Sequence, residues 1–178
     1  MAAAAERLKQ LVRSVPDFPK PGIVFRDITT VISDARALRE TVKLMADPFR
    51  DQGIDVVVGV ESRGFIFGAA VAIELGVGFV PVRKPGKLPA ETVREEYSLE
   101  YGTDAIEMHA DAISKGQKVL MVDDLLATGG TMAAACHLVE RQGGQVAGIA
   151  FLIELEFLGG RKKLADYKTV ALIGYDSE

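Results

Sequence analysis

The amino-acid sequence predicts an α/β fold, with a parallel β-sheet flanked by helices in a single domain. Short, continuously apolar segments alternate with helical segments from residue 56 to residue 173. Continuously apolar strands are typical of a parallel sheet that helices cover on both faces. Polar and Gly-rich segments follow several of these strands, at the edge where such sheets bind ligands. The length of 178 residues agrees with one domain.

The first 55 residues lie outside this alternation. Residues 3–15 have helical spacing and end at Pro16. Residues 16–27 cannot be helical, because proline restricts both its own φ and the conformation of the preceding residue. Residues 1–33 are therefore expected to form a small hood over the site. A helix is predicted over residues 34–52, with Ser33 or Asp34 as its N-cap and Gly53 at its end.

The remaining elements follow from hydrophobic periodicity. Pro81 weakens the prediction for one strand, because proline cannot donate a ladder hydrogen bond. Residues 83–102 form a long polar connection, which in a compact domain is either disordered or a functional lid. Strands are predicted over 56–58, 79–82, 119–122, 146–153 and 169–173, and helices over 65–75, 104–114, 132–142 and 161–165.

Composition excludes several classes of function. Lys plus Arg total 21 and Asp plus Glu total 25, which leaves a net charge of −4 and no broad basic surface for nucleic acid. Cys136 is the single cysteine, so an intramolecular disulfide is impossible, which suits a reducing cytoplasm. The N-terminus has the wrong order of charged and apolar residues for a signal peptide. The apolar run 146–153 is too short to span a membrane. A soluble, cytoplasmic protein that binds no membrane is expected.

An anion site is predicted where the strand 119–122 leads into the following helix. The loop 127–131 is rich in Gly and Thr. At a helix N-terminus, backbone N–H groups without partners and the helix dipole favour a phosphate. Asp123 and Asp124 cannot bind that phosphate, because like charges repel, so they must face sugar hydroxyls or a metal ion. The pattern indicates a phosphorylated ribose, and it is not a Walker loop because Gly-Lys-[Ser/Thr] is absent.

Two further clusters are less specific by themselves. Residues 61–64 follow the strand 56–58, and they could be an ordinary surface loop. The cations at 83, 84 and 87 could simply be solvated. If the bound anion were a leaving group that gains negative charge as its bond breaks, these cations would instead stabilise the transition state more than the ground state.

The segment 119–131 resembles the phosphoribosyl-pyrophosphate motif of type I phosphoribosyltransferases, in the form found in their adenine-specific branch. Residues 16–28, 61–65 and 83–89 with 97–102 match the same family in the same order, over roughly residues 16–157. The resemblance implies a Rossmann-like parallel sheet with an N-terminal hood. It also implies a purine-salvage reaction, in which adenine and phosphoribosyl pyrophosphate give AMP and pyrophosphate.

The resemblance assigns roles to particular residues of this chain. It implies that Asp123 and Asp124 bind the ribose hydroxyls; that Ala127, Thr128, Gly129, Gly130 and Thr131 bind the 5′-phosphate; that Glu61, Ser62, Arg63, Arg83, Lys84 and Lys87 bind pyrophosphate; that Val24, Phe25, Arg26 and Leu125 bind adenine; and that Glu100 and Arg63 are catalytic, with Glu100 handling the purine proton.

Further implications concern the metal, the assembly and the lid. Mg²⁺ is expected to be held mainly through the substrate, and a homodimer is expected in which Arg83 reaches the neighbouring site. The loop 61–64 can carry a strained or cis peptide. Gly86 and Gly102 are candidate hinges of the lid, in which residues 94–96 depart from the small and hydroxyl residues of the family. Oxopurine-specific relatives commonly carry Asp at the position of Ala127, so Ala127 favours adenine.

Two alternatives remain at the level of sequence. The base could be hypoxanthine, guanine or xanthine. The chain could also be a phosphoribosyl-pyrophosphate sensor that regulates transcription, but such a protein needs a nucleic-acid surface or an added domain. The acidic composition, the single domain and the complete lid argue against a sensor.

Overall fold

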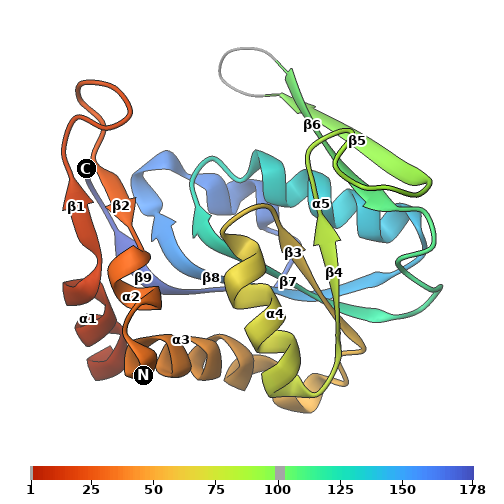
Figure 1. The fold of residues 1–178 in the computed structure, drawn as a ribbon, viewed down its shortest axis with the longest axis horizontal. Coiled ribbons are helices and arrows are strands. Elements are labelled where there is room, and N and C mark those ends of the chain that lie inside the picture. The colour runs from red at the N-terminus through yellow and green to blue at the C-terminus, as the bar shows by residue number, and fades with distance from the viewer. Residues whose placement is uncertain (1, 99–102) are drawn as a thin grey trace.

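The computed structural model describes residues 2–98 and 103–178, and its centre is a parallel sheet of five strands (Figure 1). The strand order is β4-β3-β7-β8-β9, and every pairing between neighbours is parallel. The predicted fold class is therefore confirmed. The strands are β3 (Val56–Val60), β4 (Gly78–Val82), β7 (Lys118–Leu126), β8 (Gln145–Leu155) and β9 (Thr169–Tyr175).

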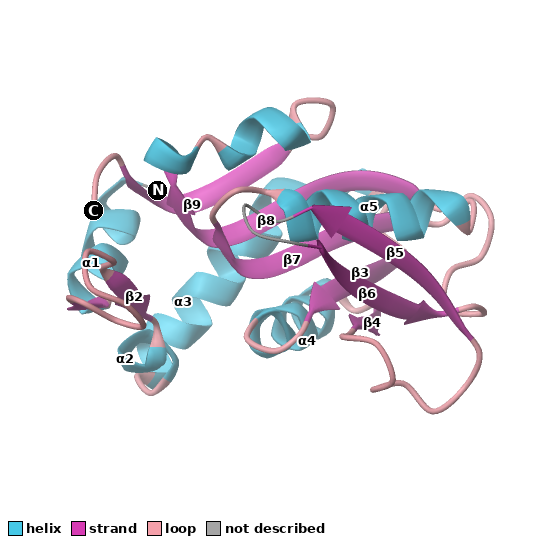
Figure 2. Ribbon diagram, turned by 90° about the horizontal axis from the view of Figure 1, so that it is seen from above, coloured by secondary structure: helices cyan, strands magenta, loops and turns pink. Residues whose placement is uncertain are grey.

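Helices cover both faces of this sheet (Figure 2). Alternate strand residues point to opposite faces, so Val57 and Leu120 pack with one core cluster while Val58 and Met121 pack with the other. The first cluster is covered by α1 (Ala2–Leu11), α2 (Thr29–Ile32), α3 (Ala35–Ala46) and α4 (Gly64–Leu75), and the second by α5 (Gly130–Arg141).

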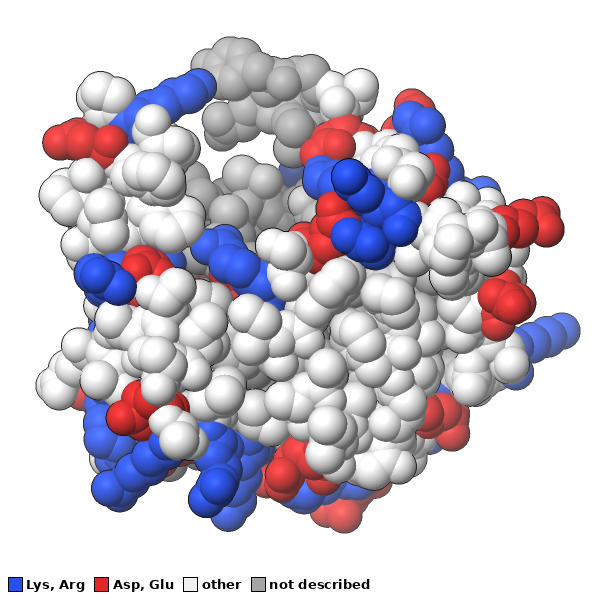
Figure 3. Space-filling view, viewed as in Figure 1, with Lys and Arg blue, Asp and Glu red and all other residues white. Residues whose placement is uncertain are grey.

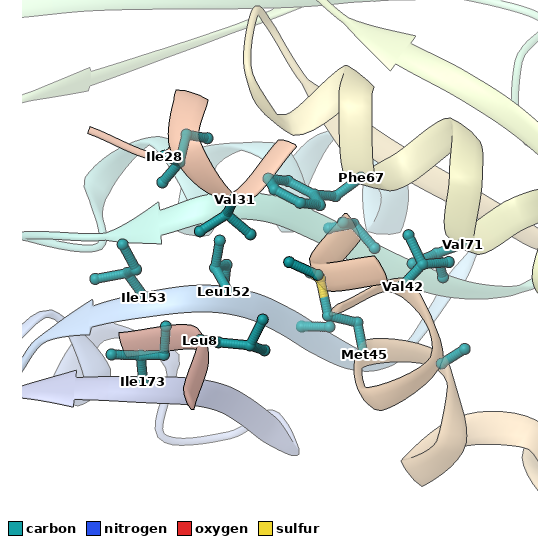
Figure 4. Packing of buried hydrophobic residues seen from close by; sticks show 14 of the residues in the cluster. Leu8, Ile28, Val31, Val42, Met45, Phe67, Val71, Leu152, Ile153 and Ile173 are labelled. Atoms are coloured by element: carbon teal, nitrogen blue, oxygen red, sulfur yellow. The ribbon is translucent and has the colours of Figure 1, made fainter. Parts of the chain in front are cut away.

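The N-terminal segment is anchored in the first core cluster. Leu8 and Val31 are fully buried there, and they lie with Leu152 of β8 and Phe67 of α4 (Figure 4). Between these anchors, β1 (Arg13–Val15) and β2 (Phe25–Asp27) form a small antiparallel ladder. The helix predicted over residues 3–15 thus ends at Leu11, because the next residues pair with β2.

The helix predicted over residues 34–52 is divided in two. Asp34 is the N-cap, since its side chain accepts a hydrogen bond of 2.7 Å from the amide of Ala37. The α-helix ends at Ala46, and a 3₁₀ segment (Asp47–Gln52) with Pro48 in its first turn follows. Gly53 ends that segment with φ of 66°, a left-handed conformation that suits glycine.

The prediction of a helix over residues 104–114 is wrong. Residues Thr103–His109 form β6, which pairs antiparallel with β5 (Thr92–Ser98). Ile106 and Met108 are buried at period two, the period of a strand. The partner strand lies inside the segment interpreted as irregular, so its pairing was not recognised. Residues 92–98 of the expected lid are therefore one strand of a hairpin, and contacts with α5 hold this hairpin over that helix (Figure 2).

The strand order determines where the ligand-binding loops meet. Because β3 and β7 are neighbours and parallel, the loop after β3 and the loop after β7 emerge side by side at the carboxyl edge. β4 is an edge strand, which explains how Pro81 is accommodated. A 3₁₀ segment at Gly160–Leu164 replaces the short helix expected after β8. In the part of the chain that the structure describes, no helix has the length and apolarity needed to cross a membrane.

Candidate active site

A cavity of about 340 Å³ opens at the carboxyl edge of β3 and β7. Figure 3 shows this face hollowed between the N-terminal segment and the β5–β6 hairpin, with Lys and Arg side chains beside the hollow. The cavity is lined by Val60, Glu61, Ser62, Arg63, Lys84, Tyr97, Ile106, Asp123, Asp124, Leu125, Leu126, Ala127, Thr128, Gly129, Gly130, Thr131, Met132 and Phe151. The structure thus brings together the two loops that the sequence singled out.

The loop after β7 is suited to hold an anion. Gly129 has φ of 76°, and α5 begins at Gly130. No side chain caps this helix start, so the first N–H groups of a 12-residue helix remain for a ligand. Thr128 and Thr131 line the same part of the cavity and can add hydroxyl donors.

Asp123 and Asp124 lie within β7, at the floor of the cavity. Asp124 is only 4% exposed, and Arg63 Nε lies 2.9 Å from its Oδ2. That contact lacks hydrogen-bond geometry, so Oδ2 is a buried acceptor without a donor. Burial raises the pKa of Asp124, against the opposing effect of Arg63. An unpartnered buried acceptor fits a ligand that brings hydroxyl donors.

Asp123 is held by its neighbour. Its Oδ1 accepts a hydrogen bond of 2.8 Å from the amide of Asp124. Burial, and next the negative charge of Asp124, raise the pKa of Asp123 well above its usual value. A site with a half-buried carboxylate next to a buried one is electrostatically costly in the free protein, which is typical of functional sites.

Arg63 connects the cavity with the hood. Its guanidinium carbon lies 5.2 Å from the centre of the Phe25 ring, a cation–π distance. Phe25 in turn makes an edge contact with Phe18, with 5.3 Å between ring centres. The base-binding segment expected in the hood therefore lies beside the loop expected to bind pyrophosphate.

Lys84 is the cation of its cluster that lines the cavity. Its ammonium forms an ion pair with Asp104 of β6 and donates to the Tyr97 hydroxyl at 3.3 Å. Burial opposes the charge of Lys84, but the bonds to Asp104 and Tyr97 outweigh it and raise the pKa. The bond from Lys84 also lowers the pKa of Asp104. The hairpin is thus joined to the cavity through a charged contact.

Arg83 and Lys87 are not among the residues that line the cavity. Arg83 Nε lies 2.7 Å from Glu61 Oε2, and Arg83 Nη1 donates to the carbonyl of Lys87 at 3.2 Å. The Glu61–Ser62 peptide is cis. The Glu61 side chain is thus held by Arg83, which does not itself line the cavity.

The predicted adenine-binding residues divide into two groups. Leu125 lines the cavity, while Val24 and Phe25 are half-buried in the hood. Arg26 is buried, and its guanidinium donates to Ser14 Oγ at 2.5 Å and lies 3.9 Å from the Tyr175 ring. Its side chain therefore ties the hood to β9. The adenine-binding role of these residues stays a prediction.

The catalytic role predicted for Glu100 falls outside the described residues, as does the hinge expected at Gly102. The charged triplet at 94–96 lies within β5 and forms ion pairs there and with α5. Arg94 pairs with Glu96 at 2.9 Å, and Glu95 pairs with Arg141 of α5 at 2.8 Å. Glu95 and the carbonyl of Arg94 therefore attach the hairpin to Arg141 of α5.

Sequence reasoning missed several residues of the site. Tyr97 and Ile106 line the cavity from the hairpin, and the apolar residues Ile106 and Met108 at a spacing of two were the signal that could have identified β6 as a strand. Gly64 belongs to the predicted loop 61–64, and the structure adds why it is glycine: a Cβ there would lie 2.6 Å from Asp123 Oδ1. Gly160 packs against the loop after β7, which no local pattern indicates.

The fold and the cavity define a class of enzyme that handles phosphorylated ribose. Residues 30–173 match the family model described as "Phosphoribosyl transferase domain". The chain belongs to this phosphoribosyltransferase family, and more narrowly to its adenine phosphoribosyltransferases, as three relatives demonstrate.

The first relative is the adenine phosphoribosyltransferase of Clostridium perfringens, 62% identical over 95% of this chain and 98% of its own. A crystal structure of adenine phosphoribosyltransferase from Rhodothermus marinus is 55% identical, with a TM-score of 0.94 over 98% of this chain and 100% of the other. The Saccharomyces cerevisiae enzyme, complexed with an imino-altritol bisphosphate and adenine, is 41% identical, with a TM-score of 0.91 over 97% of this chain and 99% of the other.

Proposed function

We propose that this protein transfers the 5-phosphoribosyl group from phosphoribosyl pyrophosphate to adenine, giving AMP and pyrophosphate in purine salvage. One observation carries the proposal: the loop after β3 and the anion-binding loop after β7 share one cavity. Relatives named adenine phosphoribosyltransferase at up to 62% identity support adenine as the base.

The substrate is proposed to lie along the carboxyl edge of the sheet. The 5′-phosphate binds the N–H groups of residues 127–131, and the ribose hydroxyls donate to Asp123 and Asp124. Asp124 Oδ2, which is buried and accepts no hydrogen bond, supports this placement. Pyrophosphate lies against Glu61, Ser62, Arg63 and Lys84, with Arg83 and Lys87 as outer cations.

The reaction is a displacement at C1 of the ribose. The C1–O bond to pyrophosphate breaks with its electron pair leaving on oxygen, and N9 of adenine forms the new bond to C1. Arg63 and Lys84 stabilise the charge that develops on pyrophosphate. Adenine is held between the hood, with Val24, Phe25 and Arg26, and Leu125. Glu100 is proposed to accept the proton that N9 loses.

Mg²⁺ is proposed to accompany the substrate. Within residues 2–98 and 103–178, no cluster of three or more His, Cys, Asp or Glu could hold a metal. The carboxylates of Asp123 and Asp124 are hard oxygen donors, the kind that Mg²⁺ prefers together with phosphate oxygens. When bound, Mg²⁺ would neutralise charge on pyrophosphate.

The assembly proposed is a cytoplasmic homodimer of single-domain subunits, with residues 1–33 as the hood and residues 83–102 as the lid. The apolar helix α4 supports a second copy as partner, because Ile66 and Ile73 are 39% and 81% exposed on it. Arg83 lies on the connection that follows the neighbouring edge strand β4, and it is proposed to serve as the outer cation of the partner's pyrophosphate site.

A turnover assay tests the proposal. The protein is incubated with Mg²⁺, phosphoribosyl pyrophosphate and one base at a time, and nucleotide formation is measured for adenine, hypoxanthine, guanine and xanthine. AMP formation with the highest kcat/KM for adenine is expected. A higher kcat/KM for an oxopurine would change the substrate, and RNA or DNA binding without AMP formation would favour a sensor.

A further inference from the structure

The turn at Gly159–Gly160 packs backbone to backbone against the loop after β7. A Cβ on Gly129 would lie 2.4 Å from the carbonyl oxygen of Gly160. A Cβ on Gly160 would lie 2.1 Å from the carbonyl oxygen of Ala127 and 2.9 Å from the amide nitrogen of Gly129. The turn therefore supports the loop directly, with no room for a side chain between them.

An ion pair between the buried Glu154 and the exposed Arg161 holds this turn in place. Glu154 is 6% exposed in β8, in register with Leu126 of β7, the residue before Ala127. Its carboxylate oxygens accept from Arg161 Nε at 2.9 Å and 3.1 Å, and one of them also accepts from Nη2. Arg161 is the residue after Gly160. The pair therefore ties the turn to the strand beside the loop.

The guanidinium has a second anchor. Arg161 Nη1 donates to the carbonyl of Thr169, at the start of β9, at 2.8 Å. The hydrogen bond to Glu154 raises the pKa of Arg161, so the guanidinium stays charged. Neither Glu154 nor Arg161 is among the residues that line the cavity. Their effect on a ligand must therefore pass through the backbone of Gly160.

We propose that Glu154 and Arg161 are positioning residues for the phosphate-binding loop, which they hold at the geometry that directs its N–H groups at the 5′-phosphate. The inference rests on the proposed function. Rigid support of a binding loop from behind lowers the cost of ordering that loop when the ligand binds. Loss of the ion pair should therefore weaken the binding of ligands that carry the ribose phosphate. Pyrophosphate binds the other loop, so its affinity should change less.

The test compares these two kinds of ligand by isothermal titration calorimetry. Glu154→Gln is expected to weaken AMP binding about tenfold or more, the size of effect seen when a residue that orients a binding group, without touching the ligand, is lost. Pyrophosphate binding is expected to stay within about twofold, as for an independent site. In steady-state kinetics, KM for phosphoribosyl pyrophosphate should rise while KM for adenine stays unchanged.

Two further variants separate positioning from simple destabilisation. Gly160→Ala leaves both charges in place but inserts a Cβ against the loop, so it should produce the same selective loss of AMP binding. Arg161→Lys keeps a cation opposite Glu154 but loses the forked geometry, so an intermediate loss is expected. If Glu154→Gln does not fold, Arg161→Lys carries the comparison with the same two outcomes.

The control is Glu74→Gln, which breaks the ion pair of Glu74 with Arg50. Glu74 lies ten residues along α4 from the cavity end of that helix, about 15 Å at 1.5 Å per residue. This control should bind AMP like the unaltered protein. The inference is overturned if Glu154→Gln, or Arg161→Lys in its place, binds AMP normally or loses AMP and pyrophosphate alike. Failure of the unaltered protein to make AMP would instead overturn the proposed function.

Discussion

Arg63, in the loop after β3, and Asp124, within β7, form an ion pair across the floor of the cavity, with 2.9 Å between Nε and Oδ2. The pair joins the loop proposed to bind pyrophosphate to the carboxylate proposed to bind ribose. In the free protein Arg63 compensates part of the charge of Asp124. A pyrophosphate ligand in the cavity would give Arg63 a second anionic partner besides Asp124.

Arg63→Gln is expected to lower kcat/KM by about 10²–10³-fold, the effect of removing one charged donor from a developing anion. Pyrophosphate binding should weaken as well, because the neutral amide cannot replace the guanidinium. Initial rates and calorimetry measure both effects. Arg50→Gln, which removes a cation paired with Asp47 and Glu74 away from the cavity, is the control. An unchanged kcat/KM would remove Arg63 from the mechanism.

Asp123→Asn is expected to stabilise the free protein while it abolishes AMP formation. Burial raises the folded pKa of Asp123 above 3.8, so the folded state holds its proton more tightly than the unfolded chain. The free energy of unfolding therefore falls as pH rises above 3.8 through the folded pKa, and the whole penalty is present above it. Asn carries no such penalty.

The measurement for Asp123 is the melting temperature between pH 4 and pH 8. The variant should melt higher than the unaltered protein at pH 7.5, and the difference should narrow towards pH 4. A variant that melts lower at pH 7.5 would contradict the electrostatic interpretation. Glu140→Gln, which changes an exposed carboxylate of α5, should leave this pH dependence unaltered.

The sheet was predictable from sequence because its strands are buried on both faces. Val56 to Val58 and Val119 to Val122 read as apolar runs without any tertiary information. The β5–β6 hairpin was not predictable in the same way. Its strands carry charged residues such as Arg94 and Glu107, and they are stabilised by contacts with α5 that only the folded chain supplies.

The site was predictable where chemistry is local in sequence. Asp123 to Thr131 are contiguous in the sequence, so their chemistry can be read together, and they line one cavity. Gly160 could not be identified, because its contact with Ala127 joins segments more than 30 residues apart. Arg26 was identified from its motif, but the motif gives no information about its contact with Tyr175, whose ring lies against the guanidinium.

Glu100→Ala is expected to lose most of kcat with little change in phosphoribosyl-pyrophosphate binding. A group that accepts the N9 proton acts in the chemical step, so its loss affects kcat rather than the affinity for the first substrate. Steady-state kinetics with calorimetry separate the two parameters. Glu91→Ala, elsewhere in the same connection, is the control. An unchanged kcat would exclude Glu100 from the mechanism.

Asp104→Asn is expected to tighten pyrophosphate binding by about two- to fivefold, the range for a partly exposed ion pair. Asp104 holds the ammonium of Lys84 at the cavity wall and adds a negative charge near the proposed pyrophosphate position. Without that charge, Lys84 can bind the ligand without giving up a partner. The gain should shrink at high salt, which screens it. Asp104→Glu keeps the charge and should show no gain, and weaker pyrophosphate binding by Asp104→Asn would contradict the expectation.

Gly64→Ala is expected to lower both stability and kcat/KM, because the site has no space for a methyl group. The new Cβ would lie 2.6 Å from Asp123 Oδ1 and 3.1 Å from the carbonyl oxygen of Val122. Overpacking of this kind costs about 1–3 kcal/mol, and relief requires that α4 or the carboxylate move. Gly78→Ala is the matched control, since its Cβ would meet nothing closer than 3.9 Å. Thermal melts and initial rates on both variants decide the matter: normal kcat/KM in Gly64→Ala would mean that Asp123 tolerates displacement, which is incompatible with a role in holding the ribose.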